Sequence, residues 1–134
     1  MSEPIETAQS GHGMIAFLLI FLTIFITVTG QLLAKAGMTE VGQIPTDKSK
    51  LIGFVIHSYT NWKVIAAFLC GVFASFTWIG AVSRSDISFA YPFMGLAIVL
   101  VLLLSPLIFR EEVPLTRWVG VIVVCIGLWI ASRG

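Results

Sequence analysis

Polar side chains recur at intervals of four residues within an apolar segment near the start of the chain: Thr23, Thr27, Gln31 and Lys35. Residues four apart lie on one face of an α-helix, so a helix here carries a stripe of hydroxyl, amide and ammonium groups. Polar groups are costly in a bilayer, and the stripe is expected to face protein or a hydrated cavity. Its groups can hydrogen-bond to neighbouring helices while the lysine reaches the headgroups. Alternatively they face a substrate, whose phosphate the lysine can bind as a point charge.

The composition indicates that lipid is the solvent for most of this chain. Of 134 residues, 57% are hydrophobic and only 11% are charged, against about 25% charged residues in an ordinary soluble domain. The same numbers exclude disorder, which requires a charge-rich and apolar-poor chain. Eight basic against seven acidic residues give a net charge of +1, so there is no basic face for nucleic acid.

Long stretches without any charged residue set the expected architecture: residues 7–34, 64–83, 87–109 and 118–132. A helix needs about 20 apolar residues to cross a bilayer core of about 30 Å. The last stretch is short, but Leu115 and Thr116 can extend it while Arg117 reaches the headgroups. We therefore predict an all-α, integral membrane bundle of four transmembrane helices in one domain, residues 1–134. The helices are expected at about residues 14–35, 63–83, 88–109 and 115–132.

The long first connection, residues 36–62, contains an apolar segment at 51–56 that is too short to span a membrane. It is either a short helix lying at the membrane interface or a buried turn of the loop. An even number of spans puts both termini on one side, with Arg84 and Arg133. The other side carries more basic residues: Lys35, Lys48, Lys50, Lys63, Arg110 and Arg117. This bias predicts a cytoplasmic first loop and periplasmic termini.

Small residues mark faces where helices can approach closely. Gly71 and Ser75 lie on one face of the second expected helix, and Gly120 and Gly127 on one face of the fourth. Such residues pack helices of one chain together, or join subunits. Tyr91, near the start of the third helix, places a hydroxyl just below the interface. It is either an interfacial anchor or a further substrate-binding residue.

No pattern in the sequence predicts an enzyme. There is no phosphate loop, Ser/His/Asp set or zinc-ligand spacing, and we expect neither a metal nor another cofactor. Glu111 and Glu112 neighbour Arg110 and Arg117 in sequence. Solvated ion pairs within this loop are the expected arrangement.

Three segments give the chain a family resemblance. They are Thr29-Gly-Gln-Leu-Leu-Ala-Lys-Ala36, Ile87-Ser-Phe-Ala-Tyr-Pro92, and Glu112-Val-Pro-Leu-Thr116 followed by Arg117-Trp-Val-Gly120 and Gly127. Together with the helix spacing they cover residues 14–132. Over this range the chain resembles the drug/metabolite transporter superfamily, in its short four-helix branch.

Two subfamilies of that branch compete. Small multidrug-resistance exporters are similar in Ala90-Tyr91 and in the glycines of the fourth helix. They depend on a membrane-embedded glutamate three residues before the glycine that matches Gly30, where this chain has Thr27. The other subfamily comprises EamA-type proteins and flippase subunits for aminoarabinose linked to undecaprenyl phosphate. Its Gly-Gln…Lys and Ala-Tyr-Pro pattern is similar to Gly30, Gln31, Lys35 and Ala90-Tyr91-Pro92, and the longer first loop also fits it better.

The resemblance implies a transporter of the bacterial inner membrane that moves a lipid-linked sugar or similar amphiphile. It also implies a homodimer, or a heterodimer with a related small subunit, because four helices enclose little space. Thr27, Gln31, Lys35 and Tyr91 are the expected substrate-binding residues, with Lys35 and Gln31 at the phosphate. The alternative is an exporter of cationic drugs or polyamines like the multidrug exporters. A subunit that scaffolds a membrane glycosyltransferase is a third possibility.

Overall fold

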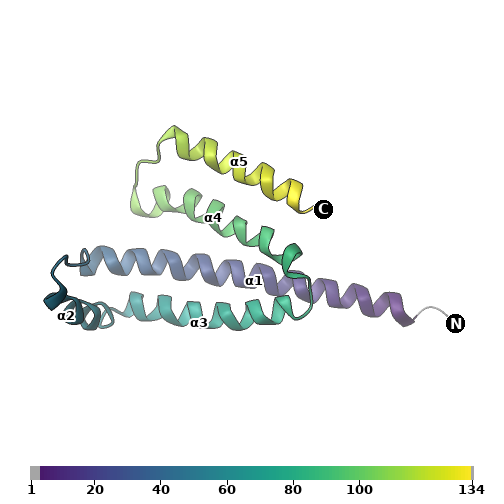
Figure 1. Ribbon diagram of the computed structural model, residues 1–134, viewed down its shortest axis with the longest axis horizontal. Coiled ribbons are helices and arrows are strands. Elements are labelled where there is room, and N and C mark those ends of the chain that lie inside the picture. Colours follow the sequence, from purple (N-terminus) through teal and green to yellow (C-terminus); the bar gives the residue numbers. More distant parts are fainter. Residues whose placement is uncertain (1–3, 134) are drawn as a thin grey trace.

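All regular secondary structure in the described part of the chain is helical, which confirms the all-α prediction. The computed structural model describes the backbone of residues 4–133 and the side chains of residues 13–133. The helices are α1 (Pro4–Val41), α2 (Lys48–Ser58), α3 (Trp62–Val82), α4 (Ile87–Phe109) and α5 (Leu115–Ala131) (Figure 1). The four long helices expected from the sequence correspond to α1, α3, α4 and α5.

Three helices within residues 4–133 are long and apolar enough to cross a membrane: Gly13–Val41 of α1, Trp62–Val82 and Ile87–Phe109. The fourth, α5, has 17 residues, fewer than the roughly 20 that a bilayer core requires. The predicted fourth span therefore stays a prediction. It requires that polar ends of α5 reach the headgroups on both sides.

The first helix continues beyond its predicted end at residue 35 and runs to Val41. Gly37 lies inside this extra turn, where its missing side chain lets α1 approach α3. The helix ends where Gly42 adopts a φ of +106°, a left-handed conformation that glycine reaches without steric cost. The amide of Gly42 donates to the carbonyl of Met38 at 2.9 Å, which closes the last turn.

The apolar segment predicted at residues 51–56 lies within the 11-residue helix α2. Its N-cap is Asp47, whose carboxylate accepts a hydrogen bond from the Ser49 amide at 3.1 Å, and this satisfies one of the unpaired donors of the first turn. The segment is therefore helical in the structure. Its position at a membrane interface stays a prediction.

Helices α1 and α3 form the closest pair in the fold and lie side by side in opposite directions (Figure 1). Gly30 and Gly37 face α3, where a Cβ on Gly30 would come within 2.9 Å of the Cys70 Cβ. Closer to the N-terminus of α1, the Thr23 hydroxyl donates to the Thr77 hydroxyl of α3 at 2.7 Å. Small residues and interhelical hydrogen bonds are the means by which helices associate where lipid supplies no hydrophobic drive.

Helix α4 packs along a different face of α1, and α5 packs mainly against α4 as the outermost helix (Figure 1). The contact between α1 and α4 is apolar and centres on buried side chains: Ile20, Ile24, Val28, Ala90 and Ala97. Helices α3 and α4 barely touch each other. Pro92 lies inside α4 without interrupting it, and the helix is continuous from Ile87 to Phe109.

Candidate functional site

A groove of about 660 Å³ runs along α1 and α3, and Tyr91 and Met94 of α4 line it near the start of α4. Its existence follows from the packing, because α1 contacts both helices while they scarcely contact each other. The lining comprises Thr23, Thr27, Gly30, Gln31, Ala34, Tyr59, Val64, Ala67, Phe68, Gly71, Ala74, Ser75, Trp78, Tyr91 and Met94. None of these residues is charged. The side chains on α1 include a polar stripe, and most of the remaining lining residues are apolar.

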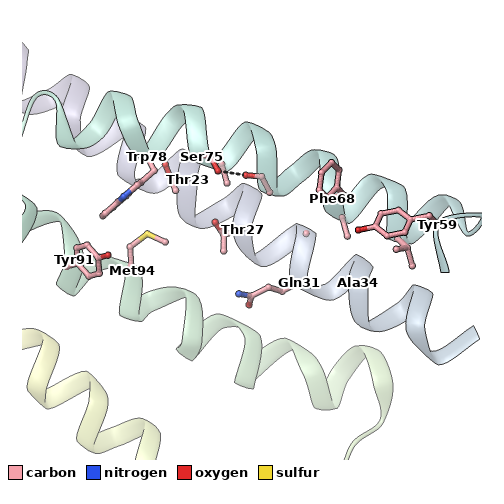
Figure 2. A pocket seen from close by; sticks show the side chains of 15 residues that line it. Thr23, Thr27, Gln31, Ala34, Tyr59, Phe68, Ser75, Trp78, Tyr91 and Met94 are labelled. Atoms are coloured by element: carbon pink, nitrogen blue, oxygen red, sulfur yellow. Dashed lines mark hydrogen bonds between the residues drawn. The ribbon is translucent and has the colours of Figure 1, made fainter. Parts of the chain in front are cut away.

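The stripe predicted on α1 supplies the polar floor of this groove. Thr27 is half-buried and Gln31 is exposed, and both point into the space beside α1 (Figure 2). Among the hydrogen bonds of the described side chains, none involves the Thr27 hydroxyl or the Gln31 amide. Both groups can therefore bind a polar ligand in the groove.

Thr23 differs from the rest of the stripe. It is buried, with 2% of its surface exposed, and its hydroxyl lies 2.7 Å from both the Leu19 carbonyl and the Thr77 hydroxyl. The sequence left two roles open for the stripe, hydrogen bonding to a neighbouring helix or contact with a substrate. Thr23 has the first of these roles. Such a bond contributes on average about 0.6 kcal/mol in a membrane protein.

Aromatic side chains lie at the end of the groove near the start of α4. Tyr91 meets Trp78 edge to face, with ring centroids 5.3 Å apart and planes at 80°, and Met94 lies beside Tyr91 (Figure 2). The structure thus places Tyr91 in the same groove as Thr27 and Gln31. Trp78 was not among the predicted residues, although it lies on the helix face that carries Gly71 and Ser75, and extension of that stripe would have included it.

Gly71, Gly120 and Gly127, predicted to allow close approach of helices, contact no neighbouring helix in the described part of the chain. A Cβ on Gly71, Gly120 or Gly127 would meet no heavy atom within 4 Å. Gly71 and Ser75 line the groove instead, and the Ser75 hydroxyl donates to the Gly71 carbonyl at 2.9 Å. A role for Gly120 and Gly127 between chains stays a prediction.

Lys35 lies outside the groove lining, one helical turn beyond Gln31. Its ammonium is 3.0 Å from one carboxylate oxygen of Glu111, and the Ser105 hydroxyl donates to the other at 2.5 Å. The sequence instead suggested that Glu111 pairs with its neighbours Arg110 and Arg117. The structure favours the distant lysine because the packing of α4 along α1 brings the end of α4 to Lys35.

These contacts favour the ionised form of the Glu111 carboxyl. The hydrogen bond from Ser105, and then the ammonium of Lys35, hold the pKa of the Glu111 carboxyl below its usual value near 4.5, and the charge of Arg117 adds to this effect. A carboxylate whose pKa is lowered by folding stabilises the fold above its unfolded pKa. That contribution disappears as the pH falls through the lowered, folded pKa.

Acid should therefore destabilise the wild-type protein more than a variant without this carboxylate. Melting temperatures in detergent, measured from about pH 7 to about pH 3, are expected to fall more steeply for wild type than for Glu111→Gln. The variant starts slightly lower, because a partly exposed ion pair contributes little to stability, and the two curves converge in acid. Parallel curves over this range would contradict the assignment of the pair.

Curated relatives cover most of the chain. A protein of Aeromonas hydrophila is 30% identical over 112 residues, which span 82% of this chain and 90% of that protein. Relatives from Hamiltonella defensa and Serratia proteamaculans are 29% and 27% identical over 118 and 119 residues. These span 88% and 89% of this chain, and 96% of each relative. All three carry the name probable 4-amino-4-deoxy-L-arabinose-phosphoundecaprenol flippase subunit ArnE. The chain belongs to the ArnE family.

Family membership confirms the resemblance drawn from the sequence. No protein-family model matches the chain, and no solved structure matches it. The relatives in the ArnE family are named as subunits of a flippase and not as enzymes. Together with three helices of spanning length, this makes the chain a helical membrane protein.

Proposed function

We propose that this chain is a subunit of an inner-membrane flippase that moves a polyprenyl-phosphate-linked sugar between the two leaflets. The headgroup travels along the groove formed by α1, α3 and α4, while the polyprenyl tail stays in the surrounding lipid. The relatives' names supply the class of substrate, a sugar linked to phosphoundecaprenol. The groove supplies a route of suitable chemistry.

The observation that carries the proposal is the uncharged polar floor of the groove. A sugar and its phosphate lose hydrogen bonds to water when they enter a bilayer, and each unreplaced bond is costly. The Thr27 hydroxyl and the Gln31 amide offer replacements midway along α1. The Tyr91 hydroxyl and the Trp78 indole N–H offer further hydrogen bonds at the end of the groove near the start of α4. A headgroup can therefore cross without full exposure to acyl chains.

Cation export by proton exchange is the competing function, and the lining of the groove argues against it. Such exchange requires a carboxylate that binds a proton and a cation in turn. The groove lining contains neither aspartate nor glutamate, and Thr27 occupies the position where the multidrug exporters carry their glutamate. A test of proton-driven uptake in vesicles separates the two functions, and we expect no dependence on a pH gradient.

The open side of the groove is consistent with a dimer. One chain lines the groove mainly with α1 and α3, and a second copy or a related small subunit would enclose the headgroup on the open side. We retain Gly120 and Gly127 on α5 as the candidate contact between subunits, since no part of the described chain covers them. Crosslinking between cysteines placed at these positions would test this arrangement.

The orientation completes the proposal. With the first loop in the cytoplasm, Lys35 and Gln31 lie toward the cytoplasmic leaflet, where the phosphate of the carrier is first bound. Tyr91 then lies toward the periplasmic leaflet, where it assists release of the headgroup. This membrane orientation follows from the excess of basic residues on the side of the first loop.

A reconstituted assay tests the proposed function. The chain, alone and together with a related small subunit, is inserted into vesicles that contain a fluorescent polyprenyl-phosphate aminosugar. A membrane-impermeant quencher then reports the fraction of label in the outer leaflet over time. We expect the protein to speed equilibration between leaflets relative to protein-free vesicles. Equal rates in every preparation would refute the proposal.

The role of Lys35 is tested in the same assay. Lys35→Ala removes a charge-assisted contact to the phosphate, and such contacts contribute about 1.5–3 kcal/mol. We expect translocation to fall at least about tenfold while the amount and size of the purified assembly stay unchanged. Wild-type transport by this variant would count against the role.

A further inference from the structure

Two ion pairs lie near the end of α1, and the first of them is structural. The Lys63 ammonium contacts one carboxylate oxygen of Glu40, and the Asn61 amide donates to the other at 2.8 Å. Asn61 also caps α3, because its side-chain oxygen accepts from the Lys63 amide at 2.9 Å. This pair therefore fixes the end of α1 to the start of α3.

The second pair, Lys35 with Glu111, has a different character. It joins α1 to the connection that follows α4, and the Lys35 and Glu111 side chains are 55% and 37% exposed. Neither residue caps a helix. Exposed pairs of this kind contribute little to stability, so either partner can be exchanged for another group of the same charge at small cost.

The surroundings of Glu111 match those of a bound phosphate. One carboxylate oxygen contacts the ammonium of Lys35, and the other accepts a hydrogen bond from the Ser105 hydroxyl. Phosphate oxygens take the same two partners, an ammonium and a hydroxyl donor, with charge-assisted hydrogen bonds. The next residue on this side of α1 is Gln31, which lines the groove.

We propose that the Glu111 carboxylate is a displaceable substitute for a lipid phosphate, which takes its place on Lys35 and Ser105. This inference rests on the proposed function and specifies where the substrate first binds. Displacement also removes the contact between α1 and the end of α4. The exchange thus couples arrival of the phosphate to loss of the ion pair that joins α1 to the connection after α4.

Binding measurements on the purified full chain test the exchange. Undecaprenyl phosphate is titrated into protein in detergent and its affinity measured by native mass spectrometry. Glu111→Gln keeps the shape of the side chain but frees Lys35, and we expect affinity to rise about three- to tenfold. Lys35→Gln is expected to lower it at least about fivefold. In the double variant, affinity should equal that of Lys35→Gln, because the competitor has no effect once the binding group is gone.

Glu112→Gln is the matched control. It removes the same charge at the adjacent position, and Glu112 forms no ion pair among the described side chains. We expect less than about a twofold change in affinity. An equal gain from Glu112→Gln would show general electrostatics and overturn the proposal, as would an unchanged or weaker affinity for Glu111→Gln.

Two further ligands identify the source of the phosphate. Undecaprenol, which lacks phosphate, should bind equally to wild type and Glu111→Gln, and inorganic phosphate should bind far more weakly than the lipid. Inorganic phosphate that binds as tightly as the lipid would overturn the lipid assignment. If the order of affinities holds but vesicles show no translocation, the phosphate site stands and the proposed flippase function fails.

Discussion

Gly30→Leu should largely prevent α1 and α3 from packing and leave little folded protein. A Cβ at this position would lie 2.9 Å from the Cys70 Cβ and 3.4 Å from the Ala67 carbonyl oxygen. Neither atom is the free end of a flexible side chain, so the helices themselves must separate. Overpacking costs about 1–3 kcal/mol for modest additions, a large part of a total stability of about 5–15 kcal/mol. Separation would also break the Thr23–Thr77 hydrogen bond.

The measurement is the yield of monodisperse protein in detergent, together with its melting temperature. Gly53→Leu is the control, because a Cβ on Gly53 in α2 would meet no heavy atom within 4 Å. We expect the control to keep the wild-type yield and melting temperature. A stable Gly30→Leu protein would mean that α1 and α3 do not approach at this glycine.

Gly71→Leu should abolish translocation but leave the protein stable, in contrast to Gly30→Leu, which should prevent folding. Gly71 lines the groove, and a Cβ there would meet no heavy atom within 4 Å. A leucine therefore fits without moving α1 or α3, but its side chain fills part of the space that the headgroup requires. Leucine also favours the helix over glycine by somewhat less than about 1 kcal/mol.

The variant is to be compared with wild type in the leaflet-accessibility assay and by melting temperature. We expect translocation at the protein-free rate and a melting temperature at or above wild type. Wild-type transport would show that the headgroup does not pass Gly71. A loss of stability as large as that of Gly30→Leu would instead place Gly71 in a helix contact, as the sequence first suggested.

The pair of glycines shows where sequence reasoning ends. Gly30 and Gly71 are both small residues in apolar helices, yet one is enclosed by α3 and the other faces open space. Which face of a helix meets a neighbour depends on rotation about its axis, and small-residue spacing alone does not determine this rotation. The sequence therefore predicted the helices but not which glycines join them.

The polar stripe was predictable because its period is local. Thr27 and Gln31 lie on one helix face in any α-helix, and an apolar environment forces that face toward protein or a cavity. The ion pair of Lys35 with Glu111 was not predictable in the same way. It depends on how α4 crosses α1, and nothing near Glu111 in sequence distinguishes Lys35 from Arg110 as its partner.

Photocrosslinking tests the central claim most directly, that the headgroup travels along the stripe of α1. A photoreactive amino acid is placed at Thr27 or Gln31 in the groove, and as a control at Phe25, a side chain on α1 that is 70% exposed and outside the groove lining. Each protein is irradiated in vesicles with a polyprenyl-phosphate sugar labelled on its headgroup. The account predicts labelled protein from the two groove positions and little from Phe25. Equal labelling at all three, or labelling at Phe25 alone, would contradict it.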